Sequence, residues 1–386
     1  MASTIINATA NTMLRLLRNR PILVSSSIGL SGLSAHSFMK EWEAENKVKQ
    51  AQLKTKIANI SQDNDNDDIL QLPRDYNRCE IERFWKERPV TVACRFISIT
   101  AELAPILWAY IRDFRLFPFD EMTTTTSTTN DEYLTLQRLH ASNVRLALTS
   151  LGPAFVKIGQ QLSIRPDLLP PIVLAELQKL CDSVEPIADS VALEVLRAEL
   201  GFETVEQIGE TFENLHLVAS ASLGQVYKAT VKDTKEEVAL KVQRPDMTRN
   251  VSLDLYLLNK YGELVDVITS KFTEQLPFHA AFIDCFAQGS YKELDYENEA
   301  KNQEFFKSEF LKRKSNVYVP SVYRQFSSRR VLTTEWVNGV KLADAPKERI
   351  RQLIPVGVEL FLTQMLDIGV MHCDPHPGNL YVTKKH

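Results

Sequence analysis

The spacing of apolar residues separates a helical N-terminal half from a region of strands. Apolar side chains recur at helical spacing over residues 134–151 and 174–184, which predicts helices that each bury one face. Near Leu215 the period changes to two, and the runs HLVAS, GQVYKATV and EVALKVQRP alternate or are rich in β-branched residues. Residues 234–237 (TKEE) fit the tip of a hairpin. The pattern therefore predicts helices that lead into an antiparallel sheet.

The C-terminal third mixes both signals. Helical patterns return over residues 254–271, 282–310 and 349–368, while VYVPSVY and RRVLTTEWV are typical of strands. The last helix leads into the loop HCDPHPGN and a short strand, LYV. Together these elements predict the α+β fold class.

The first part of the chain is divided by changes in composition. Residues 1–40 contain basic residues but no Asp or Glu, which is typical of an organelle transit peptide; an ordinary disordered N-terminus is the alternative. Residues 40–60 predict a solvated helix, and the acidic run 61–68 predicts a linker. A threonine-rich loop over residues 123–129 precedes a helix that we expect to start at Asp131.

Residues 81–117 are helical and apolar in pattern, interrupted by two prolines. The chain has no uncharged apolar run of about 18 residues, the length expected of a membrane-spanning helix. Residues 89–111 come closest but contain Arg95 and Glu102. We expect this stretch to be a buried core helix, with a helix at a membrane interface as the alternative.

Composition narrows the classes of function. The 386 residues are 44% hydrophobic and 24% charged, with a net charge of −4, which indicates a globular protein without the basic excess of nucleic-acid binders. The five cysteines are scattered and form no CxxC pair. This pattern favours a reducing compartment and argues against a disulfide framework or a cysteine zinc site.

The loop HCDPHPGN carries the strongest candidate chemistry. Asp374 and Asn379 stand five residues apart before a strand, the spacing at which kinase-type folds place an acid near the attacking hydroxyl and an amide on Mg²⁺. The Asn379 carbonyl is a hard oxygen ligand that suits Mg²⁺. A structural turn is one alternative, and a zinc site on His372, Cys373 and His376, without an evident fourth ligand, is another. Metal-dependent phosphate chemistry is the favoured interpretation.

A strand lysine and a loop of small residues predict contact with phosphate groups. Lys241 stands inside the apolar run VALKV, where an ammonium group needs a partner. Small side chains one hairpin earlier allow backbone amides to approach a phosphate, although the usual GxGxxG pattern is absent. The loop comprises Ala219, Ser220, Ala221, Ser222, Leu223, Gly224 and Gln225.

Two predicted helices carry further polar candidates. The run ELDYENEA offers Glu293, Asp295 and Glu299 as counter-ions for a lysine. Upstream, Lys157 and Gln160 stand at i and i+3 and therefore share one helix face.

These segments, taken in order, resemble the UbiB-like (aarF-domain-containing, ADCK) family of atypical protein kinases. The segments are FVKIGQQLSIRPDLLP, ASASLGQVYKA, VALKVQRP, KELDYENEAKN, TTEWVNG and HCDPHPGN. The resemblance covers residues 81–386 and is strongest from Gly152 onward. It implies a two-lobed protein-kinase-like fold with a helical extension in front, and ATP or ADP with Mg²⁺ as the ligand.

The resemblance also implies roles for individual residues. The catalytic residues are the loop acid Asp374, the phosphate-binding Lys241 and its partner Glu299. The nucleotide-binding residues, from the alanine-rich loop, the third strand and the hinge, are Ala219, Ser220, Ala221, Ser222, Gly224, Gln225, Lys241, Thr334, Glu335 and Val337. The regulatory residues, from the KxGQ signature over the nucleotide site and the ExD signature that faces it, are Lys157, Gly159, Gln160, Glu293 and Asp295. The metal ligand is Asn379.

Known members of the family support prenylquinone metabolism in bacteria, mitochondria and plastids. The resemblance therefore implies such a role in an organelle, with a prenylquinone-related or other lipid substrate and peripheral membrane association. The segment DYNRCEIERFWKERPVTVACRF favours a plastid over a mitochondrion. A nucleotide-sensing pseudokinase scaffold at a membrane and a small-molecule phosphotransferase are the alternative functions.

The sequence stops seven residues after Asn379, before the DFG-like Asp that would be a second Mg²⁺ ligand. The resemblance thus implies a C-terminally truncated kinase fold. The expected organisation has five parts: a transit peptide over 1–40, a polar helix, linker and apolar helices over 41–130, a helical extension with the KxGQ signature over 131–210, an N-lobe over 211–340 and the start of a C-lobe over 341–386.

Overall fold

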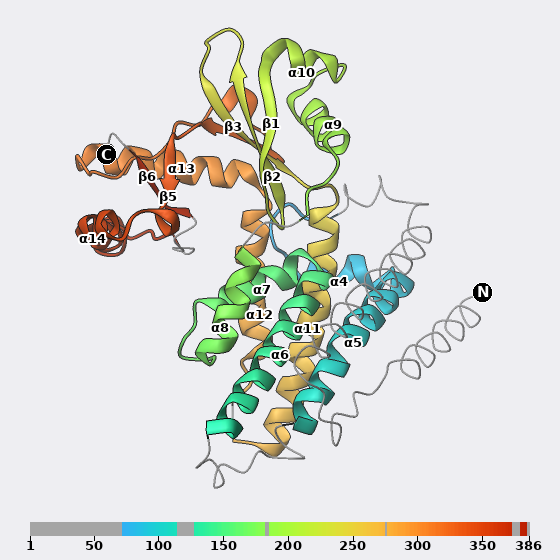
Figure 1. The fold of residues 1–386 in the computed structure, drawn as a ribbon. Helices are drawn as coiled ribbons and strands as arrows, with labels where there is room; N and C mark the ends of the chain where they lie inside the picture. The colour runs from blue at the N-terminus through green and yellow to red at the C-terminus, as the bar shows by residue number, and fades with distance from the viewer. Residues whose placement is uncertain (1–71, 114–126, 182–184, 275, 373–378, 384–386) are drawn as a thin grey trace.

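The computed structural model describes residues 72–113, 127–181, 185–274, 276–372 and 379–383. A bundle of long helices lies on one side of a small antiparallel sheet, and the C-terminal elements lie beside both (Figure 1). The α+β fold class is therefore confirmed. The predicted transit peptide, the polar helix and the acidic linker lie outside the described residues.

Among the described residues, five α-helices come before the two short helices that lead into the sheet. They are α4 (Arg78–Lys86), α5 (Pro89–Ile111), α6 (Ser127–Leu151), α7 (Pro153–Ser163) and α8 (Pro171–Gln178). Asn77 caps α4, where its side chain accepts hydrogen bonds from the Cys79 and Glu80 amides at 3.1 and 3.3 Å. The helices α5, α7 and α8 each have proline in the first turn, where the missing N–H leaves no bond unmade.

The sheet follows two short helices, α9 (Asp189–Leu200) and α10 (Glu206–Thr211). Its strands pair antiparallel in chain order, and they are β1 (Phe212–Ser220), β2 (Gly224–Val231), β3 (Glu237–Gln243) and β4 (Val331–Glu335). The hairpin expected around residues 234–237 is confirmed, with Lys235 in the left-handed conformation at φ 60°. Alternate strand residues are fully buried against α9, as the period of two requires; they are Tyr227, Ala229, Val231, Val238, Leu240 and Val242.

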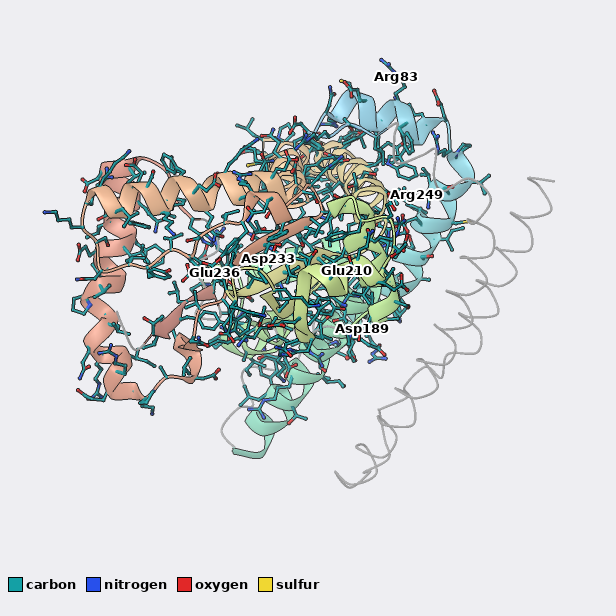
Figure 2. The ribbon with its side chains drawn as sticks, turned by 90° about the horizontal axis from the view of Figure 1, so that it is seen from above. Arg83, Asp189, Glu210, Asp233, Glu236 and Arg249 are labelled. Carbon is teal, nitrogen blue, oxygen red and sulfur yellow. The ribbon has the colours of Figure 1, made fainter. Side chains whose placement is uncertain are left out.

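Between β3 and β4 the described chain forms three α-helices and a short 3₁₀ turn (Arg324–Phe326), and the rest of the described chain forms a smaller unit. The three helices are α11 (Met247–Phe272), α12 (His279–Glu293) and α13 (Tyr296–Lys312). The smaller unit comprises β5 (Gly339–Lys341), α14 (Lys347–Leu362), a π-helical segment (Thr363–Ile368) and β6 (Tyr381–Thr383), and β5 pairs with β6. Viewed from above, the sheet and the turn that carries Asp233 and Glu236 lie between α4, marked by Arg83, and α14 (Figure 2).

The helices share a core of their own. Trp85, Ile99, Leu177 and Leu255 are at most 2% exposed, and Leu148, Leu151, Phe155, Val156, Leu180 and Tyr291 surround them. Burial of this apolar surface holds the N-terminal helices against α11 and α12. The N-terminal helices, α11 and α12 therefore pack as one helical body.

The expectation of a buried core helix over residues 89–111 is wrong. Within α5 only Ile99 is buried, whereas Leu107, Trp108 and Tyr110 are 60, 59 and 50% exposed. The helix is apolar around most of its circumference, and while one side packs on its neighbours, the large apolar side chains of the other side stay exposed. Among the described residues, α5 is long and apolar enough to cross a membrane by length and composition.

Several elements differ from the sequence expectation. Helix α6 begins at Ser127 instead of Asp131, so the last part of the predicted threonine-rich loop is helical. The single helix expected over 282–310 is two helices, because Leu294 and Asp295 end α12 and cap α13. The run VYVPSVY is not a strand and contributes an isolated bridge between Val322 and Thr334.

Candidate nucleotide site

Lys241 and Glu299 come together across the sheet and α13. Lys241 lies between the buried Leu240 and Val242, so its side chain points to the opposite face of the sheet. Its Nζ donates hydrogen bonds to Glu299 Oε1 and Oε2 at 2.8 and 2.7 Å. The two side chains are 34 and 37% exposed, so the ion pair is within reach of solvent and of a ligand.

Helix α13 covers the face of the sheet that carries Lys241. Tyr296 and Ala300 pack against Leu332 of β4, which pairs in register with Lys241. The Lys241 ammonium also lies 4.6 Å from the centre of the Tyr296 ring. Burial lowers the pKa of Lys241, but the charge of Glu299 and the nearby Tyr296 and Glu293 outweigh that effect and raise it. Lys241 therefore stays protonated near neutral pH, as a phosphate ligand must.

The small-residue loop lies at the end of the same face. Ala219 and Ser220 end β1, and the turn closes with a hydrogen bond of 2.8 Å from the Ala221 amide to the Gly224 carbonyl. A Cβ on Gly224 would lie 2.5 Å from the Val242 carbonyl oxygen and 2.8 Å from the Tyr296 hydroxyl. Only glycine therefore lets the loop pack this closely against β3 and α13.

Two polar side chains fix the ends of this loop. Gln225 is fully buried, and its side chain bonds the Ile187 backbone and the Tyr227 hydroxyl, which is a structural arrangement. Arg244 donates to the Ala221 carbonyl at 3.1 Å and to the Ser220 hydroxyl at 2.9 Å. Burial lowers the pKa of Arg244 without removing its charge. Sequence reasoning missed Arg244, although it directly follows the VALKVQ strand.

The KxGQ signature lies on α7 and faces the end of α12. Lys157 Nζ donates to Glu293 Oε1 at 2.9 Å, and Gln160 donates to the Leu180 carbonyl at 2.9 Å. A Cβ on Gly159 would lie 2.3 Å from Leu180 Cδ1, so the glycine allows the helices to approach. The charge of Glu293 also helps to raise the pKa of Lys241.

The second acid of the ExD signature, Asp295, bonds groups outside the KxGQ helix. It caps α13 by accepting a hydrogen bond of 3.0 Å from the Glu297 amide, and its carboxylate also accepts one from Arg74 at 2.7 Å. Of the two signature acids, the structure pairs Glu293 with the KxGQ helix and Asp295 with the segment before α4. Sequence reasoning missed Arg74, since an isolated arginine far upstream gives no local signal.

The hinge candidates lie at the end of β4. Glu335 accepts hydrogen bonds from the Tyr318 hydroxyl at 2.6 Å and from the Ser321 amide at 3.2 Å. These bonds outweigh burial and lower the pKa of Glu335. Thr334 and Val337 on either side are partly buried. Their contact with an adenine ring stays a prediction.

The structure describes Asn379 but not Asp374. Asn379 is exposed, and the neighbouring Leu380 carbonyl accepts a hydrogen bond of 2.8 Å from the Leu342 amide. The His372 amide donates a hydrogen bond of 2.8 Å to Gln364 Oε1. Cys373 and His376 also lie outside the described residues. Among the described residues, no group of three or more His, Cys, Asp or Glu side chains could hold a metal. The pairing of Asp374 with Asn379, like the zinc alternative, is therefore untested.

The arrangement around Lys241 fits a phosphate-bearing ligand. A partly accessible ammonium group and a tight loop of small residues, whose backbone can approach an anion, both lie next to Tyr296. The Tyr296 hydroxyl next to Gly224 is buried and has no hydrogen-bond partner among the described residues. A buried hydroxyl of this kind favours an additional partner at the site.

Residues 179–386 match the family model of the ABC1 atypical kinase-like domain, which covers more than half of the chain. The chain therefore belongs to the ABC1 atypical kinase family, and its α+β fold is kinase-like. The alanine-rich loop, the strand lysine and the helix glutamate described above all lie inside the matched region.

Curated relatives come from bacteria and plants. A Synechocystis protein of uncharacterised function is 37% identical over 320 residues, which are 80% of this chain and 52% of the relative. The Arabidopsis thaliana protein ACTIVITY OF BC1 COMPLEX KINASE 3, chloroplastic, is 39% identical over 248 residues, or 63% of this chain and 34% of the relative. A probable protein kinase UbiB of Shewanella baltica is 33% identical over 63% of this chain and 44% of the relative. The chain spans about half, or less, of the length of these relatives.

Proposed function

We propose that this chain binds ATP or ADP with Mg²⁺ at the face of the sheet that carries Lys241, and that it is the nucleotide-binding part of an atypical kinase or ATPase. The observation that carries this proposal is the Lys241–Glu299 ion pair, partly accessible and next to the loop of small residues. Family membership supports the same conclusion, because kinase-like folds use such a lysine to hold the α- and β-phosphates.

Each residue has a distinct task in this proposal. Lys241 neutralises phosphate charge, and Glu299 holds the ammonium group in place when no ligand is bound. The loop Ala219–Gln225 offers backbone amides to the phosphates, and Arg244 keeps that loop in shape. Glu335 and Val337 would border the adenine. Asp374 would accept or orient the proton of the attacking hydroxyl, and Asn379 would hold Mg²⁺, which neutralises charge on the transferred phosphate.

A nucleotide-dependent thermal shift tests the proposal. At a nucleotide concentration about 100 times Kd, linkage predicts about 2.7 kcal/mol of added stability, or a rise in Tm of about 5 °C. MgADP should produce this rise in the wild-type chain, and Lys241→Ala should abolish it because the phosphates lose their cation.

Lys228→Ala provides the matched control. Lys228 is also a strand lysine in an ion pair, with Glu237, but it lies in β2, one strand away from Lys241. This variant should keep the full rise in Tm. A wild-type chain that MgADP does not stabilise, or an unchanged rise in Lys241→Ala, would refute the proposed nucleotide site.

The second candidate is a nucleotide-sensing scaffold without phosphoryl transfer. The contact of Lys157 with Glu293 favours it, because it fixes the KxGQ helix next to the candidate site, where it would restrict a protein substrate. ATP turnover that disappears in Asp374→Asn would argue against a scaffold.

Phosphorylation of a small polar or lipid hydroxyl compound would favour the third candidate, a small-molecule phosphotransferase.

The cellular role we propose is support of prenylquinone metabolism in an organelle, a plastid before a mitochondrion, in peripheral contact with a membrane. Chloroplast names among the Arabidopsis relatives and the name UbiB in Shewanella support this setting. The exposed apolar surface of α5 is compatible with membrane contact. Expression of the full chain with a fluorescent C-terminal tag, followed by organelle fractionation, tests the location.

A further inference from the structure

Acidic side chains of the segment from Glu293 to Glu299 form ion pairs with basic side chains from three separate parts of the chain. Glu293 pairs with Lys157 of α7, and Glu299 pairs with Lys241 of β3. The two acids between them, Asp295 and Glu297, share one partner, Arg74. We call Glu293, Asp295, Glu297 and Glu299 the acidic junction. It is the place where the N-terminal segment, the extension and the sheet meet.

Arg74 bridges two carboxylates at the N-terminus of α13. Its Nε donates to Asp295 Oδ2 at 2.7 Å and its Nη2 donates to Glu297 Oε2 at 2.6 Å. The Asp295 side chain is 3% exposed, whereas the Arg74 side chain is 50% exposed. Arg74 therefore provides the charge that an otherwise buried carboxylate needs, and it does so from the surface.

Asp295 connects this bridge to the candidate site. As the cap of α13, its carboxylate fixes the first turn of the helix, and Glu299 lies in that same turn. Tyr296, the first residue of α13, packs next to Lys241 and Gly224. A change at the cap therefore moves the groups that surround the Lys241 ammonium.

We propose that Arg74 is a positioning residue for the nucleotide site: it holds the cap of α13 so that Glu299 and Tyr296 keep Lys241 in place. This inference rests on the proposed nucleotide function. It assigns part of the site to a segment more than 100 residues before the region that the family model matches. The segment around residue 74 thereby completes the nucleotide site as well as packing against the helices.

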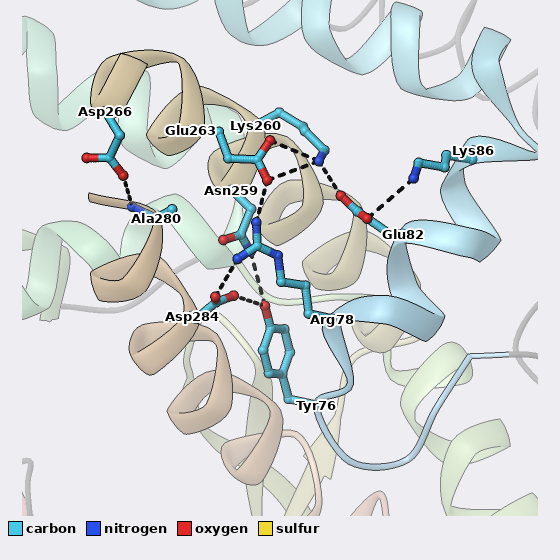
Figure 3. A network of polar contacts seen from close by, with 10 residues as sticks. All are labelled: Tyr76, Arg78, Glu82, Lys86, Asn259, Lys260, Glu263, Asp266, Ala280 and Asp284. Carbon is cyan, nitrogen blue, oxygen red and sulfur yellow. Dashed lines mark hydrogen bonds and ion pairs between the residues drawn. The ribbon is translucent and has the colours of Figure 1, made fainter. Parts of the chain in front are cut away.

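The structure supplies a matched control within the same segment. Arg78 also bridges two carboxylates, Asp284 at 2.6 Å and Glu263, but these belong to α12 and α11 (Figure 3). Tyr76 donates to Asp284 at 2.5 Å in the same network. Loss of Arg78 therefore loosens the segment without removing a partner of the α13 cap.

The experiment compares Arg74→Ala, Arg74→Lys and Arg78→Ala in the full chain. Titration calorimetry with MgADP should show Kd raised about fivefold or more in Arg74→Ala, the equivalent of about 1 kcal/mol. Arg78→Ala should lower Tm at least as much as Arg74→Ala does, but it should leave Kd within about twofold of the wild-type value. Arg74→Lys should restore part of the affinity, because a lysine can still pair with Asp295 but cannot bridge both acids.

Amide hydrogen exchange without nucleotide separates this inference from the proposed function. Arg74→Ala should speed exchange in the first two turns of α13, and Arg78→Ala should not. A wild-type chain that fails to bind MgADP would defeat the proposed function, whereas the exchange result would still decide the role of Arg74 at the cap. Unchanged Kd and exchange in Arg74→Ala, or equal changes in Arg78→Ala, would overturn the inference.

Discussion

Two ion pairs join distant parts of this chain, and their surroundings differ. Arg95 of α5 donates to both carboxylate oxygens of Asp254 in α11, at 2.6 and 2.9 Å, and also bonds the Leu151 carbonyl. The Asp254 side chain is 2% exposed. Lys241 and Glu299 are also bonded twice, but about a third of each side chain reaches solvent.

This difference separates a structural ion pair from one that is available for a ligand. The hydrogen bonds of Arg95 fix the position of Asp254 in the helical core. The bond to Leu151 is made at the end of α6, just before the KxGQ helix α7 begins at Pro153. Burial raises the pKa of Asp254, and Arg95 opposes that rise. In the proposed nucleotide complex, the Lys241–Glu299 pair would exchange one partner for a phosphate, and neither charge would be left in a dry interior.

Arg95→Ala should give the largest effect on stability. It leaves the buried Asp254 carboxylate without its cation, so we expect a loss of about 3–5 kcal/mol in the free energy of unfolding. Urea denaturation measures this free energy. The double variant Arg95→Met with Asp254→Leu should recover much of the loss. If Arg95→Ala unfolded at the same urea concentration as the wild type, the pair would not be structural.

Acid titration should give an intermediate effect. Asp266 accepts hydrogen bonds from the Phe278, His279 and Ala280 amides at 3.0 Å each, and its Oδ1 lies 2.8 Å from Nδ1 of the His279 ring (Figure 3 shows the Ala280 bond). These contacts lower the pKa of Asp266 from 3.8 to about 2 and hold the start of α12. Because the pKa is lower in the folded state, this stabilisation is present above about pH 4 and is lost as the pH falls toward 2.

Asp266→Asn is the control for the acid titration. Without an ionisable group at this position, the fall in stability between pH 4 and pH 2 should be smaller than in the wild type. Parallel pH profiles of the two proteins, followed by thermal unfolding, would mean that Asp266 does not hold α12 through its charge.

Trp108→Gln should give the smallest effect. Trp108 lies on the exposed side of α5, at 59% exposure, so we expect a change within about 0.5 kcal/mol in the free energy of unfolding. Ile99→Ala in the same helix removes a buried side chain and should cost about 2–5 kcal/mol. Equal losses in the two variants would show that the outer face of α5 is covered in solution.

Much of the fold and part of the site could be predicted from the sequence. The period of two around Lys241 predicted the sheet, because strand side chains alternate strictly. The break of the helix at Leu294 and Asp295 was missed, since the apolar spacing continues across it while the Asp295 cap acts locally. The burial of α5 was mispredicted because hydrophobicity alone does not specify which side has a neighbour.

The sequence by itself determined the elements, the α+β class and the lysine, glutamate and loop that resemble a kinase site. These follow from periodicity and from residue types at fixed spacing, which are local properties of a chain. Only the tertiary structure decided which charges meet: Arg74 with Asp295, Arg95 with Asp254, and Lys157 with Glu293. Such pairs join residues more than 130 positions apart, and their partners are set by how the helices pack rather than by any pattern along the chain.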